Sequence, residues 1–202
     1  MRLLIEDLAC VRGERRLFDS LGFTVAAGEA AVVTGPNGAG KSSLLRLIAG
    51  LLRPAGGRIL LEGSEGDGPL GASVHFVGHL DGVKGALTVR ENLEFTRALL
   101  GGEAPTPDAA LARLGLSTLA SLPARMLSAG QKRRLALARL LAAKRPLWLL
   151  DEPASALDAE GQETFAALAE EHLARGGIVV AATHTPLGFP HAQEIRLGRG
   201  GA

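Results

Sequence analysis

The stretch that decides the fold is Gly35-Pro36-Asn37-Gly38-Ala39-Gly40-Lys41-Ser42, which matches the pattern G-x-x-x-x-G-K-[ST] at every position. It follows an apolar run, Ala30 to Thr34, that predicts a strand, and it precedes a leucine-rich helical pattern. Glycines let backbone N–H groups turn toward phosphate oxygens, and the helix N-terminus adds its positive dipole end. We therefore expect this segment, through Ser43, to bind ATP or GTP, with Lys41 on the β- and γ-phosphates and Ser42 on Mg²⁺. A glycine-rich turn before a lysine by chance explains neither the strand nor the helix.

A second candidate region is the apolar strand Leu147 to Leu150, which ends in two carboxylates, Asp151 and Glu152. In an open α/β sheet the ligand lies at the carboxyl ends of the strands, which is where these two residues fall. We expect Asp151 to hold Mg²⁺ and Glu152 to act as general base toward the attacking water. An acidic N-cap for the following helix explains one carboxylate but not both.

The segment Leu127-Ser128-Ala129-Gly130-Gln131 precedes a basic amphipathic helix that runs through Leu141. It resembles the LSGGQ signature of the ATP-binding cassette (ABC) ATPases, with Ala129 at the third position. Its place between a matching phosphate loop and an acidic strand end strengthens the resemblance. In that family the signature binds the γ-phosphate held by the opposite subunit, so the resemblance implies that Ser128, Ala129, Gly130 and Gln131 act on the nucleotide of a partner.

Two later motifs are similar to the same family. Ser155-Ala156-Leu157-Asp158 resembles the D-loop that crosses the dimer interface, and His184 resembles the switch histidine that contacts the γ-phosphate and the attacking water. The resemblance covers about Leu3 to Leu197. It implies an α/β fold: a P-loop NTPase ABC cassette, with a RecA-like parallel-sheet core, N-terminal antiparallel β strands and an inserted α-helical subdomain.

Two positions depart from the family pattern. His79 stands where these cassettes usually carry a glutamine that senses Mg²⁺, and its imidazole is shorter than the glutamine side chain. It is either a working substitute or a merely tolerated one. Arg12 stands where an aromatic residue often stacks on adenine, and the chain contains no tyrosine. A guanidinium also stacks on a purine, and Phe18 is the other candidate. A metal or haem site from His75 and His79 is the remaining reading of that segment.

Where it departs from the common family pattern, the sequence resembles one subgroup: the cassettes that serve c-type cytochrome biogenesis as haem-exporter ATP-binding subunits. The segments that carry this likeness are Val77 to Thr88, Leu127 to Leu140 and Thr183 to Leu187. It implies a head-to-tail homodimer on the cytoplasmic face of the bacterial inner membrane, bound to the membrane subunit CcmB, with CcmC, CcmD and CcmE in the wider complex. Haem export and release of the haem-loaded chaperone both remain open. We expect the loop His79 to Leu87 to dock the membrane subunit, with Gly78, Gly82 and Gly85 making it mobile.

Composition limits the alternatives. Among 202 residues, 22 Lys and Arg nearly balance 21 Asp and Glu, which disfavours a nucleic-acid-binding protein. No apolar run reaches the roughly 18 residues of a membrane-spanning helix, and the single Cys10 excludes an internal disulfide. A soluble cassette, such as an iron–sulfur assembly partner, shares every ATP-site motif and stays open. Cassettes of translation or DNA repair are generally tandem or carry long insertions, which this sequence lacks.

Hydrophobic patterning predicts the order of the elements. We expect strands at Leu3 to Val11, Leu21 to Ala26, Ala30 to Thr34, Arg58 to Leu61, Val74 to Val77, Leu147 to Leu150 and Ile178 to Ala182. Ser64 to Gly71 is predicted to be a loop, and Thr88 with Glu91 is predicted to cap a helix. Further helices are expected at Asp108 to Leu114 and at about Ala159 to Arg175. The chain is interpreted as a single ABC domain over 1–202, with a core at about 1–87 and 145–202 and a helical subdomain at about 88–144.

Overall fold

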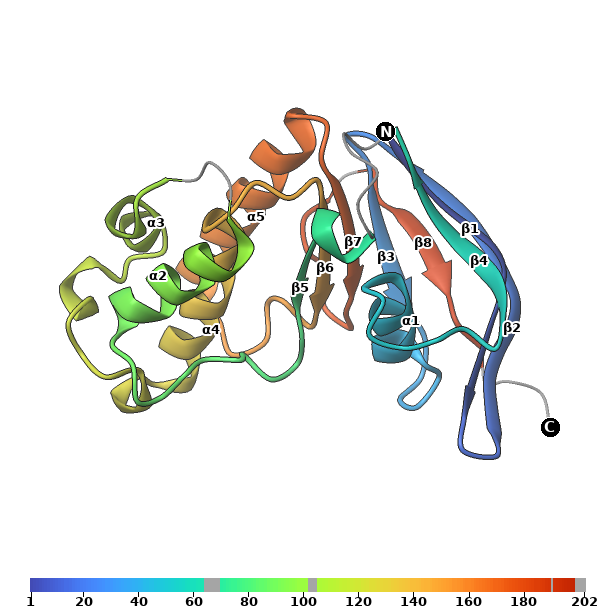
Figure 1. The fold of residues 1–202 in the computed structure, drawn as a ribbon, viewed down its shortest axis with the longest axis horizontal. Coiled ribbons are helices and arrows are strands. Elements are labelled where there is room, and N and C mark those ends of the chain that lie inside the picture. The colour runs from blue at the N-terminus through green and yellow to red at the C-terminus, as the bar shows by residue number, and fades with distance from the viewer. Residues whose placement is uncertain (64–69, 102–104, 190, 199–202) are drawn as a thin grey trace.

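Two β-sheets of different character organise the chain in the computed structural model, which describes residues 1–63, 70–101, 105–189 and 191–198 (Figure 1). The antiparallel sheet has the order β2-β1-β4, and the parallel sheet has the order β5-β6-β7-β3-β8. The strands are β1 (Arg2–Arg12), β2 (Arg15–Ala26), β3 (Ala30–Thr34), β4 (Gly56–Glu62), β5 (Val74–Val77), β6 (Leu147–Asp151), β7 (Ile178–Ala182) and β8 (Gln193–Arg196). The predicted combination of a parallel-sheet core with N-terminal antiparallel strands is confirmed.

The parallel sheet brings the ends of its strands to one edge. Every residue of β6 and β7 is buried, as expected for central strands covered on both faces. Ala182 at the end of β7 pairs with both Asp151 of β6 and Val33 of β3, and Val77 of β5 pairs with Leu150. The turns that follow these strands therefore meet at the same edge of the sheet.

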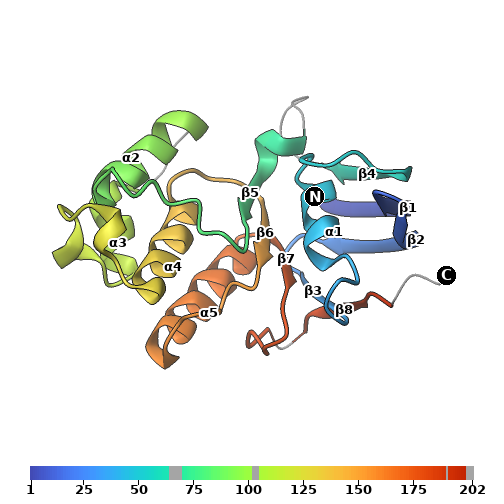
Figure 2. The ribbon, with the colours of Figure 1, turned by 90° about the horizontal axis from the view of Figure 1, so that it is seen from below.

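Two hydrophobic cores cover the two faces of the parallel sheet. On one face, helix α1 (Lys41–Ile48) lies between the two sheets, and its leucines pack with buried residues of β1, β2, β3 and β7. On the other face, α4 (Ala129–Ala138) and α5 (Ala159–Ala174) pack against β6 and β7. Figure 2 shows α1 and α4 on opposite sides of the parallel sheet.

The helices between β5 and β6 gather at one end of the molecule (Figures 1 and 2). Helix α2 (Val89–Leu100) starts with the predicted capping box: Thr88 Oγ1 accepts from the Glu91 N–H, and the Glu91 carboxylate accepts from the Thr88 N–H. Helix α3 (Pro107–Arg113) is capped by Thr106, and α4 continues into a 3₁₀ turn, Arg139–Leu141. Further 3₁₀ turns are Leu70–Ser73, Ser117–Leu119 and Ala124–Met126. Within the described ranges, every helix is too short or too polar to cross a membrane.

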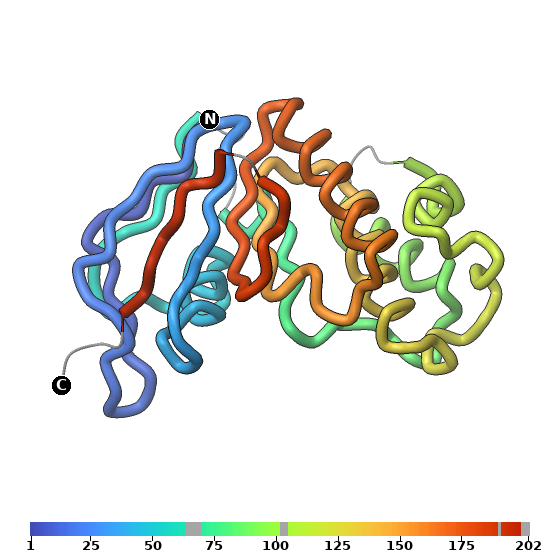
Figure 3. The backbone as a smooth tube through the Cα atoms, turned by 180° about the vertical axis from the view of Figure 1, so that it is seen from behind, coloured from blue at the N-terminus to red at the C-terminus, as the bar shows by residue number. Residues whose placement is uncertain are grey.

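The structure differs from the sequence-based expectations at two strands. Strand β2 begins at Arg15 rather than at Leu21, because Arg12 and Arg15 pair directly across a hairpin that turns at Gly13, whose φ is 61°. Strand β8 was not expected, because only Ile195 of its four residues is buried and it has no apolar run. Figure 3 shows β8 beside β3 at the edge of the parallel sheet. Most of the loop predicted at Ser64 to Gly71 lies outside the described residues.

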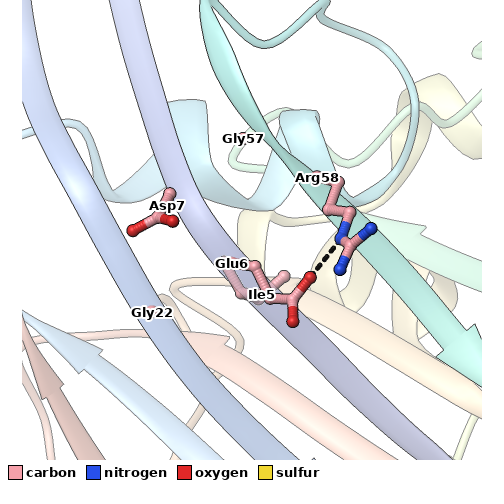
Figure 4. Close-up of a pocket in the computed structure, with 6 residues that line it drawn as sticks. All are labelled: Ile5, Glu6, Asp7, Gly22, Gly57 and Arg58. Atoms are coloured by element: carbon pink, nitrogen blue, oxygen red, sulfur yellow. Dashed lines mark hydrogen bonds and ion pairs between the residues drawn. The ribbon is translucent and has the colours of Figure 1, made fainter.

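A β-bulge shapes the outer sheet where β1 passes β4. Asp7 has a φ of 46°, and a Cβ added to Gly57 would lie 2.3 Å from the Glu6 carbonyl oxygen, so only glycine fits there. Figure 4 shows the ion pair between Glu6 and Arg58 beside this bulge, with Asp7 projecting away from it. The shallow pocket at this point is lined by residues of β1, β2 and β4 around the bulge.

Candidate nucleotide-binding site

The phosphate loop joins β3 to α1, as predicted. Gly40 is the N-cap of α1 and has a φ of 104°, and a Cβ on Gly35 (φ 137°) would lie 2.3 Å from the Leu197 carbonyl oxygen. These two glycines are therefore required by backbone conformation and close packing. The buried Lys41 ammonium donates to the carbonyl oxygens of Gly35 at 2.8 Å and Pro36 at 3.3 Å. The loop is thus folded around the lysine that is expected to bind phosphate.

Asp151 lies at the carboxyl end of β6 and is 3% exposed. Among the described residues, its Oδ2 has no hydrogen-bond partner. A buried carboxylate oxygen without a partner is costly unless a cation or a water satisfies it. The described part of the chain gathers no three His, Cys, Asp or Glu side chains that could form a metal site alone. A site with one carboxylate, a serine hydroxyl and phosphate oxygens fits Mg²⁺, which usually keeps several waters.

Glu152 follows directly and has a φ of 50°, an uncommon conformation for a residue with a side chain. Its Oε2 accepts from the Thr183 hydroxyl at 3.2 Å and from the His184 N–H at 3.4 Å. His184 Nε2 lies 3.6 Å from Glu152 Oε1 and 3.2 Å from Asn37 Oδ1. The turns after β3, β6 and β7 therefore meet through these side chains, as the alignment of the strand ends predicts.

The segment Ser128 to Gln131 forms the N-terminus of α4. Ser128 Oγ accepts from the Gln131 N–H at 3.2 Å, and Gln131 Oε1 accepts from the Ser128 N–H at 2.9 Å, which completes a capping box. A Cβ on Gly130 would lie 2.8 Å from the Ala156 carbonyl oxygen, so the helix packs closely on the following turn. Figures 1 and 2 both place α4 away from α1. The fold does not bring this segment to the phosphate loop of its own chain.

The segment predicted as a D-loop leads into α5. Asp158 is the N-cap of that helix and accepts from the Gly161 N–H at 2.9 Å. It also accepts from Arg134 at 2.6 Å, and this hydrogen bond, together with that from Gly161, holds the pKa of Asp158 below its usual range. The D-loop and α4 are thus tied to each other at one surface.

His75 and His79, the two histidines considered as a metal or haem site, lie in different environments. His79 is exposed in the loop after β5, whereas His75 is buried and its Nε2 lies 2.8 Å from the Ala143 carbonyl oxygen. Burial lowers the pKa of His75 to about 4, so the ring is neutral near pH 7. With one histidine engaged inside the sheet and the other in solvent, the geometry does not favour the metal or haem reading.

The adenine-stacking candidates lie near the β1–β2 hairpin. Arg12 is exposed at the end of β1, and Phe18 is buried and packs beside Gly40. Sequence reasoning missed Arg15 on the other arm of the hairpin, whose Nη1 would lie 4.0 Å from a Cβ on Gly38. The structure thus adds a cation beside the phosphate loop. The available signal in the sequence is the short Gly13-Glu14 turn between Arg12 and Arg15, which pairs the two arginines across a hairpin.

The loop from Gly78 to Leu87 is more tightly held than predicted. Asn92 of α2 accepts from the Lys84 N–H at 2.8 Å and donates to the Lys84 carbonyl oxygen at 3.1 Å. The three glycines that suggested mobility approach other residues closely: added Cβ atoms would lie 3.3 Å from Phe76, 2.9 Å from Arg139 and 3.3 Å from Arg125 at Gly78, Gly82 and Gly85. These glycines therefore also permit close packing, and the mobility of the loop stays a prediction.

Comparisons with known proteins agree with this geometry. The ABC transporter family matches residues 18–155. The chain is 56% identical to the cytochrome c biogenesis ATP-binding export protein CcmA of Rhodopseudomonas palustris (strain BisB5), over 95% of each chain, and 57% identical to the protein of that name from Nitrobacter winogradskyi, over 98% of each.

A solved dimeric ATP-binding cassette in a post-hydrolysis state, bound to ADP and Pi, is 25% identical with a TM-score of 0.78. The match covers 91% of this chain and 88% of that one. The similarity to the two export proteins extends over nearly the full length of both, and the same α/β arrangement recurs in the solved cassette. The chain belongs to the ABC transporter family of ATP-binding proteins, in the group of the CcmA cytochrome c biogenesis export proteins.

Proposed function

We propose that this ABC-type ATPase hydrolyses Mg·ATP at the edge of the parallel sheet and drives a membrane complex for c-type cytochrome biogenesis. One observation carries the proposal for the site: Glu152, His184 and Asn37 come from three different turns and meet beside the phosphate loop. A carboxylate, an imidazole and a phosphate-binding loop in contact are the groups that phosphoryl transfer to water needs.

Binding begins at the N-terminus of α1. Lys41 now donates to two carbonyl oxygens of its own loop, and phosphate oxygens take over part of this coordination when ATP binds. Asp151 Oδ2 and the Ser42 hydroxyl would hold Mg²⁺, which neutralises charge on the transferred phosphoryl group when it is bound. Arg12 supplies the surface for adenine, because Phe18 is buried, and His79 contacts the water shell on the side of the loop after β5.

Glu152 accepts the proton of the attacking water. Oxygen of that water bonds to the γ-phosphorus as the bond to the β–γ bridging oxygen breaks, and the electron pair leaves with ADP. The Thr183 hydroxyl and the His184 N–H fix the Glu152 carboxylate through Oε2, which leaves Oε1 beside His184 Nε2 for the water. The imidazole Nε2–H, which lies against Asn37 Oδ1 in the free chain, would donate to the γ-phosphate instead when ATP is bound.

A complete site needs two chains. The segment Ser128 to Gln131 is exposed or half-buried at its own surface and lies away from α1. A head-to-tail homodimer places the α4 N-terminus of one chain over the phosphate loop of the other. The solved relative that is dimeric and bound to ADP and Pi supports this arrangement.

The biological process follows from the relatives. Near full-length similarity to proteins named as cytochrome c biogenesis export proteins supports a role in haem export or in release of the haem-loaded chaperone, and it does not favour a soluble cassette of iron–sulfur assembly. The partners are then the membrane subunit CcmB, with CcmC, CcmD and CcmE. The similarity to these export proteins supports a location at the cytoplasmic face of the inner membrane, where the chain would bind through CcmB.

The loop after β5 and the adjoining part of α2 form the docking surface. Leu80 is 85% exposed, Phe95 and Leu99 are exposed one turn apart on α2, and Lys84 lies over the Phe95 ring. Exposed apolar side chains such as Phe95 and Leu99, one turn apart on α2, are typical of a protein interface, and Leu80 adds another in the loop. Val83, in contrast, packs against the helical core, so a charge at that position would damage folding as well as docking.

The test of the ATPase site is Glu152→Gln. The variant keeps the shape of the side chain but removes the base, so we expect unchanged ATP affinity, turnover lowered at least about 100-fold, and an ATP-trapped dimer in size-exclusion chromatography. The exposed Glu170→Gln on α5 is the matched control and should hydrolyse ATP normally. Turnover near the parental rate in Glu152→Gln would show that another group is the base.

The test of docking is the double change Leu80→Asp with Lys84→Glu. We expect this variant to keep its ATPase activity but to be lost from a co-purification with CcmB. Leu51→Asp, at an exposed leucine beyond the end of α1, is the control and should still co-purify. If both variants assemble equally well and support cytochrome c maturation, the docking surface lies elsewhere.

A further inference from the structure

One arginine in the signature helix is almost completely enclosed. Arg133 of α4 is 2% exposed, although its neighbours in sequence suggest a solvated basic helix. Its guanidinium makes five hydrogen bonds to two other segments, each at 3.1 Å or less. The acceptors are the carbonyl oxygens of Asp151, Glu152, Pro153 and Gly78 and the Oδ1 atom of Asp81.

These five bonds match what an arginine can donate. A guanidinium has five N–H donors in a rigid planar fork, whereas lysine has three on a single rotating nitrogen. Nε bonds Pro153, Nη1 bonds Gly78 and Asp81 at 3.0 Å each, and Nη2 bonds Asp151 and Glu152 at 2.7 Å each. Asp81 provides a counter-charge for the buried cation. Arginine is therefore the residue type that satisfies this enclosed set of acceptors.

The first segment held by Arg133 is the turn that carries Glu152. That residue has a φ of 50°, so its carboxylate points correctly only while the backbone of the turn keeps this uncommon conformation. Arg133 fixes the carbonyl oxygens of Asp151 and Glu152, which flank the Glu152 Cα atom. Thr183 and His184 fix the Glu152 carboxylate itself. The backbone and the side chain of Glu152 are thus held by separate groups.

The second segment is the start of the loop after β5. Gly78 is its first residue, and Asp81 lies beside the exposed Leu80. Arg139, one helical turn and a half further along, also donates to the Asp81 carbonyl oxygen at 3.0 Å. A displacement of this loop therefore pulls on the same guanidinium that holds the turn of Glu152.

We propose that Arg133 is a positioning residue for ATP hydrolysis: it sets the backbone of the Glu152 turn and makes that position depend on Asp81 in the loop after β5. The inference rests on the proposed function, since it assumes that Glu152 is the general base. One buried guanidinium thus links three parts of the molecule: the helix α4, which faces a partner cassette in the proposed dimer, the loop after β5 and the turn that carries Glu152.

The experiment compares Arg133→Lys and Arg133→Gln with the parent at saturating Mg·ATP, at a temperature well below the melting point of each. We expect the dissociation constant for ATP to stay within about threefold, because α1 and its loop are untouched, and kcat to fall at least about tenfold. Arg139→Lys is the matched control: its parent residue binds the loop but no atom of the turn, so kcat should stay within about threefold. A merely structural role would lower the melting temperature of the Arg133 variants without changing kcat per folded molecule.

The link to the loop is tested at Asp81, whose side chain is 25% exposed, and the melting temperature of each variant is measured beside its kcat. Asp81→Asn keeps an oxygen acceptor but removes the charge. We expect kcat to fall about threefold to tenfold in the parent, and no further fall when the change is added to Arg133→Gln. Independent, multiplicative losses, or parental kcat in Asp81→Asn alone, would overturn the proposed dependence on the loop.

Glu152→Gln, measured beside these variants, separates two kinds of failure. If it is inactive while folded Arg133→Lys turns over at the parental kcat, the role of Arg133 is refuted and the proposed function stands. If Glu152→Gln itself keeps parental turnover, the general base is misassigned, and the inference falls together with it.

Discussion

Two helices of this protein start at positions expected to bind phosphate, and their N-termini are built in opposite ways. Within the described residues, no side chain caps α1, which begins after Gly40. Helix α4 begins after Ser128 with a complete capping box. The first-turn N–H groups of α1 are therefore left for a ligand, whereas those of α4 are already partly satisfied by its own side chains.

The difference indicates an order of events. A single chain has reason to bind nucleotide at α1, because phosphate oxygens satisfy the N–H groups there and Lys41 adds charge. The α4 N-terminus is capped by its own side chains without a ligand, which fits a helix start that meets phosphate only across the proposed dimer. One helix start gains stability from binding, and the other contributes to a site that it does not need for its own folding.

The largest expected effect is at the uncapped helix. Lys41→Ala removes the only charged side chain at the start of α1, and we expect the affinity for ATP to fall at least about 100-fold, measured by titration calorimetry. Lys132→Ala, in the first turn of α4, is the matched control and should leave the affinity of the single chain unchanged. Equal losses at the two lysines would remove the distinction between the two helices.

The second effect concerns which chain each helix serves. Ser128→Arg should lower turnover at least about tenfold without changing the affinity of the single chain, because it blocks a contact made only across the dimer. Mixed dimers then distinguish cis from trans action. With Lys41→Ala on one chain and Ser128→Arg on the other, trans action leaves one intact site; with both changes on the same chain, both sites are defective.

The opposite pattern of activity in the two mixed dimers would mean that each signature serves its own chain. Dimers of each parent variant, prepared in the same way, provide the baseline. This result would contradict the head-to-tail arrangement while leaving the phosphate loop as proposed.

The third effect is on stability. Ser128→Ala removes the cap of α4 and should lower the free energy of unfolding by about 1 kcal/mol, as Thr88→Ala should at the similar box of α2. Denaturant titration measures both, with the exposed Ser121→Ala as a control that should have no effect. If Ser128→Ala costs nothing, the box of α4 is not a stabilising feature, and the contrast with α1 is weaker than stated.

The smallest effect is on pH dependence. The Thr88 N–H, together with its hydroxyl, holds the pKa of Glu91 below its ordinary value of 4.5, so the stability that the α2 box supplies is present above that value and is lost as the pH falls through the lower folded pKa. Gln131 in the α4 box does not titrate. Hydrogen exchange from about pH 6 to pH 3 should show the first turn of α2 opening before that of α4. Glu91→Gln should abolish the difference; its persistence would point to another titrating group.

Local sequence patterns were sufficient to predict several features of the fold and of the candidate site. The phosphate loop, the buried strands β6 and β7 and the Thr88–Glu91 box all depend on residues close together in sequence, and the structure contains them where expected. The capping box of α4 has the same spacing, from Ser128 to Gln131, so it too is predictable from residues that are close in sequence.

Features that depend on distant residues could not be predicted. Arg133 reads as one of several exposed cations, and its burial depends on carbonyl oxygens 18 to 55 positions away. Thr183 supports Glu152 across 31 positions. Strand β8 forms because β3 offers a free edge, although its own sequence is polar. In each case the partner lies in a segment that is distant in sequence, and no local side-chain pattern records the contact.

Because Glu152 has a left-handed backbone conformation, selection for stability and selection for activity favour different residues at position 152. A residue with a Cβ in this conformation costs about 1–2 kcal/mol relative to glycine, and asparagine tolerates it better than glutamate does. Random mutagenesis screened only for heat resistance should therefore enrich Gly or Asn at position 152 and return robust proteins that no longer turn over ATP. The conformational cost at this one residue is tolerated because the carboxylate is useful there, and a library sorted by function should retain it.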